Sequence, residues 1–375
     1  MNFLKNKVYV YFYYFLFIIG IIIVGLSIPI INWDIIGYVG SAYHLEYSSI
    51  TEIHKNVYNG LRDFISAEKY FALTEGGEYI KNLANNPYFF MQNLPFYEIR
   101  PIYVGLIYIL NKLGLNIFAS TYYISIFFTV ASIMLLFKTF LRKINIELLY
   151  IIPLFLMSYG VLELGRLSTP DSLAFFGISI FIYLHINSKE NWIFFLLPIL
   201  ILIRTDLIIF NVIYLIYHLL NHKKSYIKIL ACFVTSIIIY FFINSFIGNY
   251  GWSTVFKHTF IAKISNPADV QSVVLLKDYI SVLLKGIVSA MDDGIFLNYL
   301  TVFLINVLLL MRLNPNFLKI EIIKSFIIVS FIYILAHFLL FPVTWQRFFV
   351  GFYLMNALAT ILIIDGYLKK INYED

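Results

Sequence analysis

Charged residues are scarce in this chain of 375 residues. Aspartate, glutamate, lysine and arginine make up 13% of it, about half of the roughly 25% that is usual in soluble domains. Hydrophobic residues reach 61% and aromatic residues 19%, and the mean hydropathy is +0.83. A water-soluble protein of this length could not bury so much apolar surface, so the composition indicates a membrane protein.

Two further absences narrow the class of protein. Cysteine occurs once, as Cys232 inside an apolar run, which excludes a disulfide framework. Neither a Walker loop nor a glycine-rich dinucleotide fingerprint occurs, which argues against a nucleotide-sugar donor and against an ATP-driven pump. The net charge of +6 comes from scattered basic residues, which suits a bilayer with anionic lipids and does not indicate nucleic-acid binding.

Long apolar runs predict an all-α fold, a polytopic transmembrane helix bundle of about 10–12 spans. Lipid leaves backbone groups without partners, and the runs are far too long for barrel strands. The first run, residues 8–31, is longer than the core of a signal peptide, so we expect it to be retained as a span. The other expected spans are residues 118–138, 145–163, 172–187, 191–203, 206–221, 226–247, 295–311, 320–341 and 346–367.

The distribution of lysine and arginine in the short loops predicts the orientation of the chain. Lys5 and Lys7 precede the first span, and Lys369 and Lys370 follow the last, so both termini are expected in the cytoplasm. The sequence contains no internal repeat and no stretch typical of a soluble domain. Residues 1–375 are therefore expected to form a single transmembrane domain.

Two long polar segments are expected outside the cytoplasm, at residues 32–99 and 248–294. The first is too long for a mere connection, and amphipathic stretches such as 57–65 would lie on the outer surface and roof a cavity. Residues 101–113 are apolar but short for a span, so we expect an outer-face or re-entrant helix there. Residues 278–290 are expected to be amphipathic or half-inserted.

Asp34 stands where the first apolar run ends. Transfer of a sugar to a hydroxyl or amine needs a carboxylate that deprotonates or orients the acceptor. A phosphate leaving group departs as an anion, and it needs cationic stabilisation more than a protonating acid. Asp34 is therefore the candidate catalytic base. The alternative is that this carboxylate only marks the membrane interface and faces water.

Three arginines lie at the outer ends of spans or in tight outer turns: Arg166, Arg204 and Arg347. Short outer loops usually avoid arginine, and a charge kept near the membrane usually has a purpose. Each guanidinium by itself could reach lipid phosphates or pair with a nearby acid. Because the forked guanidinium suits phosphate oxygens, the three together favour a shared pocket for an anionic lipid headgroup.

Other candidates lie close to these residues or in the outer loops. Asp171 and Asp206 each neighbour one of the arginines, and we expect them to orient an arginine, touch acceptor hydroxyls or cap the following helix. Trp345 is a candidate for stacking on a sugar ring or prenyl chain, against the commoner role in an aromatic belt. His44 and Glu46 are too few for a metal site, so no metal is assigned.

Several short motifs resemble those of a known family in their order along the chain and in the side of the membrane on which they are expected. They are Trp33-Asp34-x-x-x-Tyr38-x-x-x-Ala42, Arg100-Pro101-Ile102-Tyr103, Arg166-x-x-x-Pro170-Asp171, Ile203-Arg204-Thr205-Asp206 and Trp345-Gln346-Arg347-Phe348. This series resembles the GT-C superfamily of integral membrane glycosyltransferases, which use polyprenyl-phosphate-linked sugars. It is most similar to the bacterial branch, with proteins like dolichyl-phosphate-mannose-protein mannosyltransferase and aminoarabinose transferase.

The resemblance implies a function and roles for the residues. Asp34 would be the catalytic base, and a substrate-binding set would hold the donor phosphate, the sugar and the acceptor: Tyr38, Arg166, Asp171, Arg204, Asp206, Trp345 and Arg347. The enzyme would move a hexose or pentose from a polyprenyl-phosphate carrier to a glycan, lipid or protein acceptor, without a cofactor. Its expected place is the bacterial cytoplasmic membrane, with the active site on the outer face.

Three rival functions stay open at this level. A polysaccharide polymerase or ligase of the cell envelope would place its main catalytic residues in a late outer loop. In the second outer loop, His258 and Asp269 are candidates for holding an acceptor, by location alone. A lipid-linked sugar transporter or flippase would carry ionisable residues at mid-membrane and pseudo-symmetric halves. The third is a non-catalytic subunit of an envelope assembly.

Overall fold

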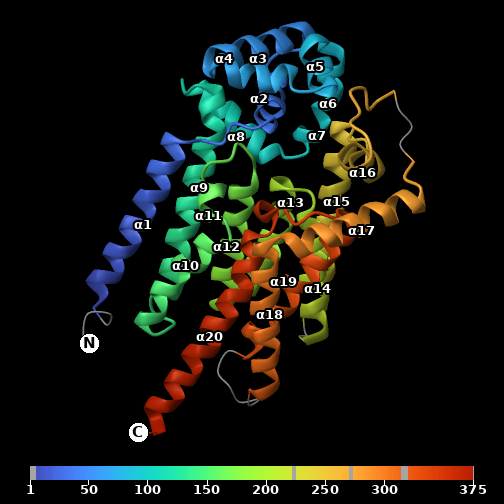
Figure 1. Cartoon of the computed structure of the whole chain (residues 1–375). Coiled ribbons are helices and arrows are strands. Elements are labelled where there is room, and N and C mark those ends of the chain that lie inside the picture. The colour runs from blue at the N-terminus through green and yellow to red at the C-terminus, as the bar shows by residue number, and fades with distance from the viewer. Residues whose placement is uncertain (1–5, 222–224, 270–272, 314–319, 375) are drawn as a thin grey trace.

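The computed structural model describes residues 6–221, 225–269, 273–313 and 320–374, and these residues form helices and connecting segments without a strand. A bundle of long helices is covered at one end by short ones (Figure 1). The predicted all-α class is therefore confirmed. Lys5 lies outside the described residues.

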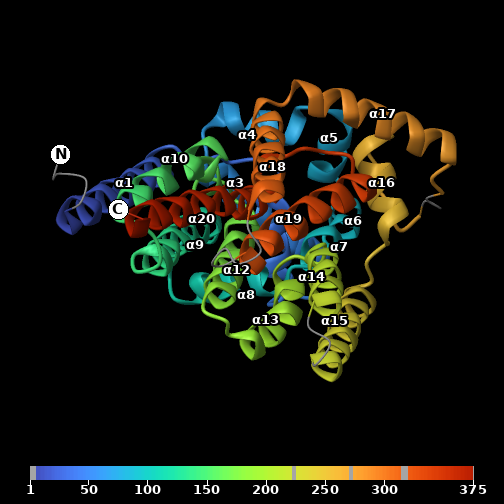
Figure 2. The same ribbon diagram turned by 90° about the horizontal axis from the view of Figure 1, so that it is seen from below.

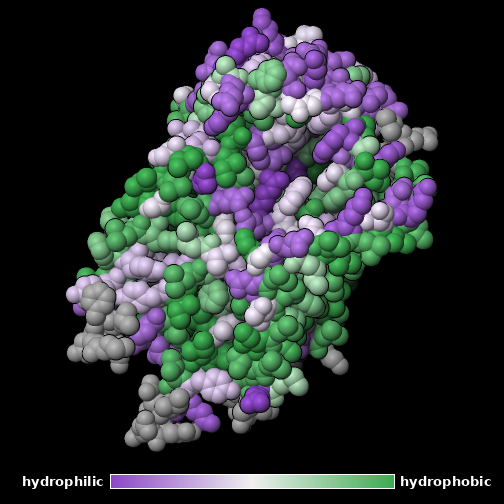
Figure 3. All heavy atoms as spheres, in the orientation of Figure 1, coloured by the Kyte–Doolittle hydropathy of each residue, from purple (hydrophilic) through white to green (hydrophobic). Residues whose placement is uncertain are grey.

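Six helices of the described part are long and apolar enough to cross a membrane, which indicates a multi-pass membrane protein. They are α1 (Lys7–Ser27), α9 (Ile117–Phe140), α15 (Tyr226–Ile247), α18 (Gly294–Arg312), α19 (Ile320–Leu340) and α20 (Val350–Glu374). Their outward side chains form a broad apolar surface below a hydrophilic end (Figure 3). On α15, for example, Phe242 and Phe246 are 65% and 80% exposed.

Four further expected spans correspond to shorter apolar helices. They are η1 (Ile146–Tyr150) with α10 (Ile151–Ser158), α12 (Asp171–Ile186), α13 (Glu190–Ile203) and α14 (Leu207–Asn221). Figure 2 shows α12, α19 and α20 near the centre of the bundle, with α1, α15 and α17 (Leu276–Asp292) toward its periphery. The centre is thus formed by the short α12 together with the long α19 and α20.

The expected span over residues 145–163 is interrupted. Helix α10 ends at Ser158, and Gly160 adopts a φ of +84° before the short α11 (Val161–Leu164) begins. A Cβ on Gly160 would lie 2.8 Å from the side chain of Gln346. The interruption therefore lets the chain pass close to the turn that follows α19.

The first outer segment folds into a cap of short helices, drawn in blue at the top of Figure 1. They are α2 (Asp34–His44), α3 (Ile50–Phe64), α4 (Ala67–Glu75), α5 (Glu78–Asn85), α6 (Pro87–Asn93) and α7 (Pro95–Glu98), followed by α8 (Pro101–Lys112). Helix α3 is amphipathic, as predicted, and buries Ile53, Val57 and Leu61 on one face. The helices of the cap pack on one another and on α8 and α9.

The second outer segment contributes α16 (Trp252–Phe260) and α17, which is longer than the predicted amphipathic stretch of 278–290. Helix α17 buries Val282, Gly286 and Ala290 at a spacing of four residues, and leaves Leu276 and Leu284 exposed. This pattern is that of an amphipathic helix with one face on the protein.

Small hydroxyl residues allow α9 and α12 to pack closely. Ser120, Ser125, Ser132 and Thr139 of α9 are buried, and each donates a hydrogen bond to the carbonyl four residues earlier. The hydroxyl groups find hydrogen-bond acceptors within their own helix. Because these side chains are small, two helices can approach closely, as is common in membrane bundles. The α9–α12 pair thus fixes the start of α12, where Asp171 lies.

The left-handed backbone at Gly160 gives a testable expectation. Gly160→Ala should lower stability by about 1–2 kcal/mol from the backbone alone, and more through the clash with Gln346. The melting temperature of the purified protein in detergent would measure the loss. Gly105→Ala is the matched control, because a Cβ there has no neighbour within 4 Å and alanine favours the helix. Equal melting temperatures for the two variants would contradict this account.

Candidate functional site

A cavity of about 460 Å³ lies between the cap and the ends of the bundle helices that face the cap, within the roughly 300–1,000 Å³ of most ligand sites. Its walls come from α2, α7, the starts of α12 and α14, α15, α16, the end of α19 and the turn η3 (Gln346–Phe348). Figure 3 shows hydrophilic side chains in a hollow below the cap. Ile208, Tyr240 and Leu340 make part of the wall apolar. The site can therefore accept an amphipathic ligand.

Asp34 lies in this cavity as the first residue of α2. The N-terminus of a helix favours an anion, and the Asp34 carboxylate also accepts hydrogen bonds from Asn32 Nδ2 at 2.9 Å and Arg347 Nη1 at 3.0 Å. Its side chain is 26% exposed, so a ligand in the cavity can reach it.

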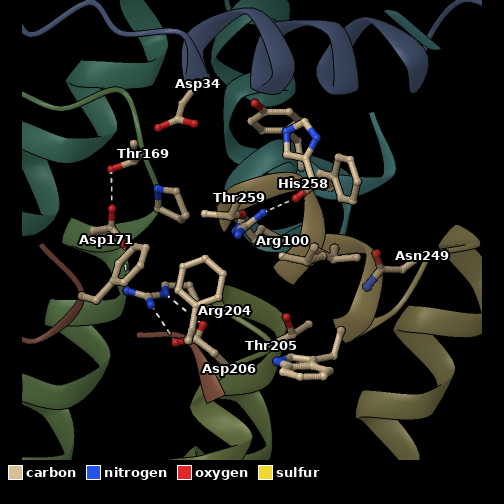
Figure 4. A pocket seen from close by; sticks show the side chains of 18 of the residues that line it. Asp34, Arg100, Thr169, Asp171, Arg204, Thr205, Asp206, Asn249, His258 and Thr259 are labelled. Carbon is tan, nitrogen blue, oxygen red and sulfur yellow. Dashed lines mark hydrogen bonds and ion pairs between the residues drawn. The ribbon is translucent and has the colours of Figure 1, made fainter. Parts of the chain in front are cut away.

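Arg204 is the centre of a buried ion-pair cluster on the other side of the cavity (Figure 4). It donates through Nη1 to Asp171 at 2.8 Å, and through Nε and Nη2 to the two oxygens of Asp206 at 3.1 and 2.6 Å. Burial alone lowers the pKa of Arg204, but the two carboxylates outweigh burial and raise it. The guanidinium is thus permanently charged and occupied by carboxylates.

Asp171 and Asp206 have further partners in the same cluster. Asp171 also accepts a hydrogen bond from Thr169 at 2.7 Å, and its side chain makes no N-terminal cap of α12. Asp206 accepts from Tyr333 at 3.2 Å and lies 3.5 Å from His337 Nε2. Of the alternatives for the two aspartates, the geometry favours orientation of an arginine.

Arg347 joins the two halves of the site. Its Nη1 contacts Asp34 at 3.0 Å, and its Nε lies 3.7 Å from Asp171. The Trp345 and Phe348 rings lie 5.2 Å from the guanidinium carbon, within the range of cation–π attraction. The neighbouring Gln346 donates a hydrogen bond to Glu163. The turn that carries Arg347 is therefore held by this bond and by the contacts of Arg347 with Asp34 and Asp171.

The structure brings most of the sequence-predicted residues into one cavity: Asp34, Tyr38, Asp171, Arg204, Asp206, Trp345 and Arg347. Arg166 is not among its lining residues. It donates from Nε to the carbonyl of Ile28 at 2.7 Å, and its own carbonyl accepts from Ile30. The expected convergence of three arginines is thus reduced to two, because Arg166 instead ties the segment after α1 to the segment before α12.

The cavity also contains residues that the sequence did not single out as site residues. Arg100 donates to the carbonyl of Phe96 and lies 5.9 Å from the Tyr38 ring. Lys263 has no ion-pair partner within the described ranges, and burial lowers its pKa although nearby Asp34 opposes this. The sequence could have identified Arg100, since it directly precedes the proline that begins α8. No sequence pattern marks Lys263, because only folding of the second outer segment brings it to the cavity.

His258 is held in one orientation. Its Nδ1 accepts a hydrogen bond from the backbone N–H of Ile264 at 3.1 Å, and its ring lies between Tyr79 and Phe96 at centroid distances of 5.1 and 5.3 Å. Burial and the nearby Lys263 lower its pKa to about 4. Near neutral pH, Nε2 therefore carries the proton of an uncharged ring and can donate a hydrogen bond.

Metal ligation has little basis in the geometry. His44 Nδ1 pairs with Glu98 at 2.6 Å, and Glu46 pairs with Lys112 at 2.5 Å, so these two ligand candidates are engaged separately. Within the part of the chain that the structure describes, no three histidine, cysteine, aspartate or glutamate residues are grouped to hold an ion.

Removing the charge of Arg204 should destabilise the protein strongly. Arg204→Gln leaves Asp171 buried without its cation, and the expected loss is about 3–5 kcal/mol. Thermal unfolding in detergent would detect it, and Asp171→Asn in the same chain should restore part of the loss. Arg166→Gln is the control, with an expected loss of about 1 kcal/mol or less. A melting temperature of Arg204→Gln equal to that of the control would refute the buried-cluster role.

The lowered pKa of His258 predicts a dependence of stability on pH. Between about 6.5 and 4 the folded protein binds fewer protons than the unfolded chain, so the free energy of unfolding decreases as pH falls through this window. The contribution is on the order of 1–3 kcal/mol. Melting temperatures at pH 7 and 5 should differ less for His258→Phe than for the unchanged protein. An identical difference would show that His258 is not the group responsible.

Comparisons with known proteins returned no match. No protein-family model, no curated protein and no solved structure is similar to the chain. The functional conclusion therefore depends on the cavity itself: which charged side chains line it, how they are paired, and where it lies relative to the apolar surface.

Proposed function

We propose that this protein is an integral membrane glycosyltransferase of the GT-C type. It would transfer a sugar from a polyprenyl-phosphate carrier to a glycan, lipid or protein acceptor. One observation carries the proposal: Asp34, at the exit of the first long helix, faces Arg347 in a cavity with a charged wall and an apolar wall. A lipid phosphate and a sugar hydroxyl together require this combination of groups.

The proposed reaction is a direct displacement at the anomeric carbon. An acceptor oxygen or nitrogen forms the new bond to that carbon, its proton passes to Asp34, and the bond between the carbon and the phosphate oxygen breaks. The lipid phosphate leaves with the electron pair as an anion, which Arg347 would stabilise. Inversion at the anomeric carbon follows from a single displacement.

Pairing of Asp34 with Arg347 suggests an order of binding. A donor phosphate offers Arg347 a second anion at the same site, and a guanidinium that turns toward it leaves the Asp34 carboxylate free to take a proton. Arg204 has a different role in this scheme, because its donors are already directed at Asp171 and Asp206. It is a positioning residue that fixes Asp171 beside Arg347.

The proposed location is the bacterial cytoplasmic membrane, with both termini in the cytoplasm and the cavity on the outer face. About ten spans would result if the four shorter apolar helices cross with the six long ones. The shorter helices would then place the cavity floor, with Arg204 and Asp206, close to the level of the lipid headgroups. This depth suits a substrate whose phosphate lies at the membrane surface.

A polymerase or ligase is the second candidate, and the second outer segment favours it. His258 and Lys263 from that segment line the same cavity as Asp34. Mutation of Asp34 or of the second outer segment would therefore reduce the activity of a transferase and of a polymerase alike. The length of the product distinguishes the two functions: a single transferred sugar supports the transferase, and a long polymer supports the polymerase. A transporter fits less well, because this ionic cluster lies at one end of the bundle.

Asp34→Asn should abolish transfer, because it keeps the shape of the side chain and removes the base. We expect a loss on the order of 10²–10⁴-fold in membranes supplied with a radiolabelled polyprenyl-phosphate sugar, at unchanged expression. Asp63→Asn is the matched control, since Asp63 is exposed on α3 and does not line the cavity. Full activity of Asp34→Asn would move the base elsewhere and reject this mechanism.

A further inference from the structure

A second cavity, of about 750 Å³, opens on the outer side of the main one. One wall comes from α5 and α6 of the cap, and the other from the end of α16 and the segment that follows it. Tyr79 and Lys263 line both cavities. We call the second cavity the outer groove; it leads from the water-facing cap to the site of Asp34.

The outer groove is fixed in place by polar contacts between the two outer segments. Asn93 of α6 donates to the carbonyl of Ser265 at 2.8 Å, and its own oxygen accepts from Tyr79 at 3.0 Å. Gln92 accepts from the N–H of Ala268 at 3.1 Å. Because the walls are joined by these bonds, the groove exists before a ligand arrives.

The charge of the outer groove is positive. Lys257 and Lys263 line it and have no ion-pair partner among the described residues, while Glu78 is the acidic side chain of the lining. Lys257 also lies in the last turn of α16, where a cation is favourable. Both lysines come from the same wall, the end of α16 and the segment that follows it, and without a carboxylate partner they leave an anionic ligand as their complement.

The remaining lining groups are those that hold sugar rings. Tyr79 and Phe89 contribute aromatic rings, and Asn82, Asn266 and Ser265 contribute amide and hydroxyl groups. Asn82 Nδ2 donates to Ser265 Oγ at 3.4 Å, so this pair joins the two walls at one point of the groove. Trp33, whose ring is 6.0 Å from that of Tyr79, continues the aromatic surface into the main cavity.

We propose that the outer groove binds an anionic oligosaccharide. Within the proposed transferase, on which this role depends, the oligosaccharide is the acceptor, and its end reaches Asp34 past Tyr79 and Lys263. The carboxylates or phosphates of the acceptor face Lys257 and Lys263, and its rings lie on Tyr79 and Phe89. The enzyme would thus modify a negatively charged glycan.

Binding of two matched probes tests the proposal without any transfer reaction. The purified full-length protein in lipid nanodiscs is titrated with a galacturonic acid hexamer and with a neutral galactose hexamer at equal ionic strength. We expect the anionic hexamer to bind at least tenfold more tightly. The double variant Lys257→Gln/Lys263→Gln should lose this binding at least tenfold, and Asn82→Asp should weaken it by adding a negative charge to the groove.

Lys277→Gln/Lys285→Gln is the control, because it removes the same charge from exposed positions of α17. No binding of the anionic hexamer, equal binding of both hexamers, or an equal loss in the control would overturn the proposal. Failure of sugar transfer by the unchanged protein, with intact binding of the hexamer, would reject the proposed reaction and leave the groove. Transfer without binding of the hexamer would reject the groove alone.

Discussion

The cap end of this protein depends on an alternating series of carboxylates and guanidiniums. Asp34, Arg347, Asp171, Arg204 and Asp206 follow one another in space, with contacts of 2.6–3.7 Å between neighbours. A single buried charge without a partner would cost several kcal/mol. Each member is stable there because its neighbours have the opposite sign.

This series also joins parts of the chain that are far apart. The exit of α1, the start of α12, the turn between α13 and α14, and the turn before α20 meet at it. The interior helices α9, α12, α19 and α20 fix the directions from which the charges arrive. Packing of the apolar bundle thus determines the electrostatics of the cavity, and the cap over the bundle gives that cavity its roof and the outer groove.

Local sequence signals predicted individual elements well and their spatial relations less well. Most apolar runs became helices near the expected bounds, because their length and periodicity are local properties. The run over 145–163 broke at Gly160, where the reason is the approach of Gln346 from a distant turn. Arg166 and Arg204 were equivalent in sequence, and tertiary contacts gave one a backbone carbonyl and the other two carboxylates.

The sequence by itself determined that this is a helical membrane protein, because scarce charge and long apolar runs admit no water-soluble fold. It also placed Asp34 and Arg347 at helix ends, since charges are excluded from the apolar interior. Only the tertiary structure decided that these two side chains meet, that Arg204 is fully paired, and that Lys263 and His258 reach the same cavity. Such pairings depend on helix packing across hundreds of residues, which no local pattern encodes.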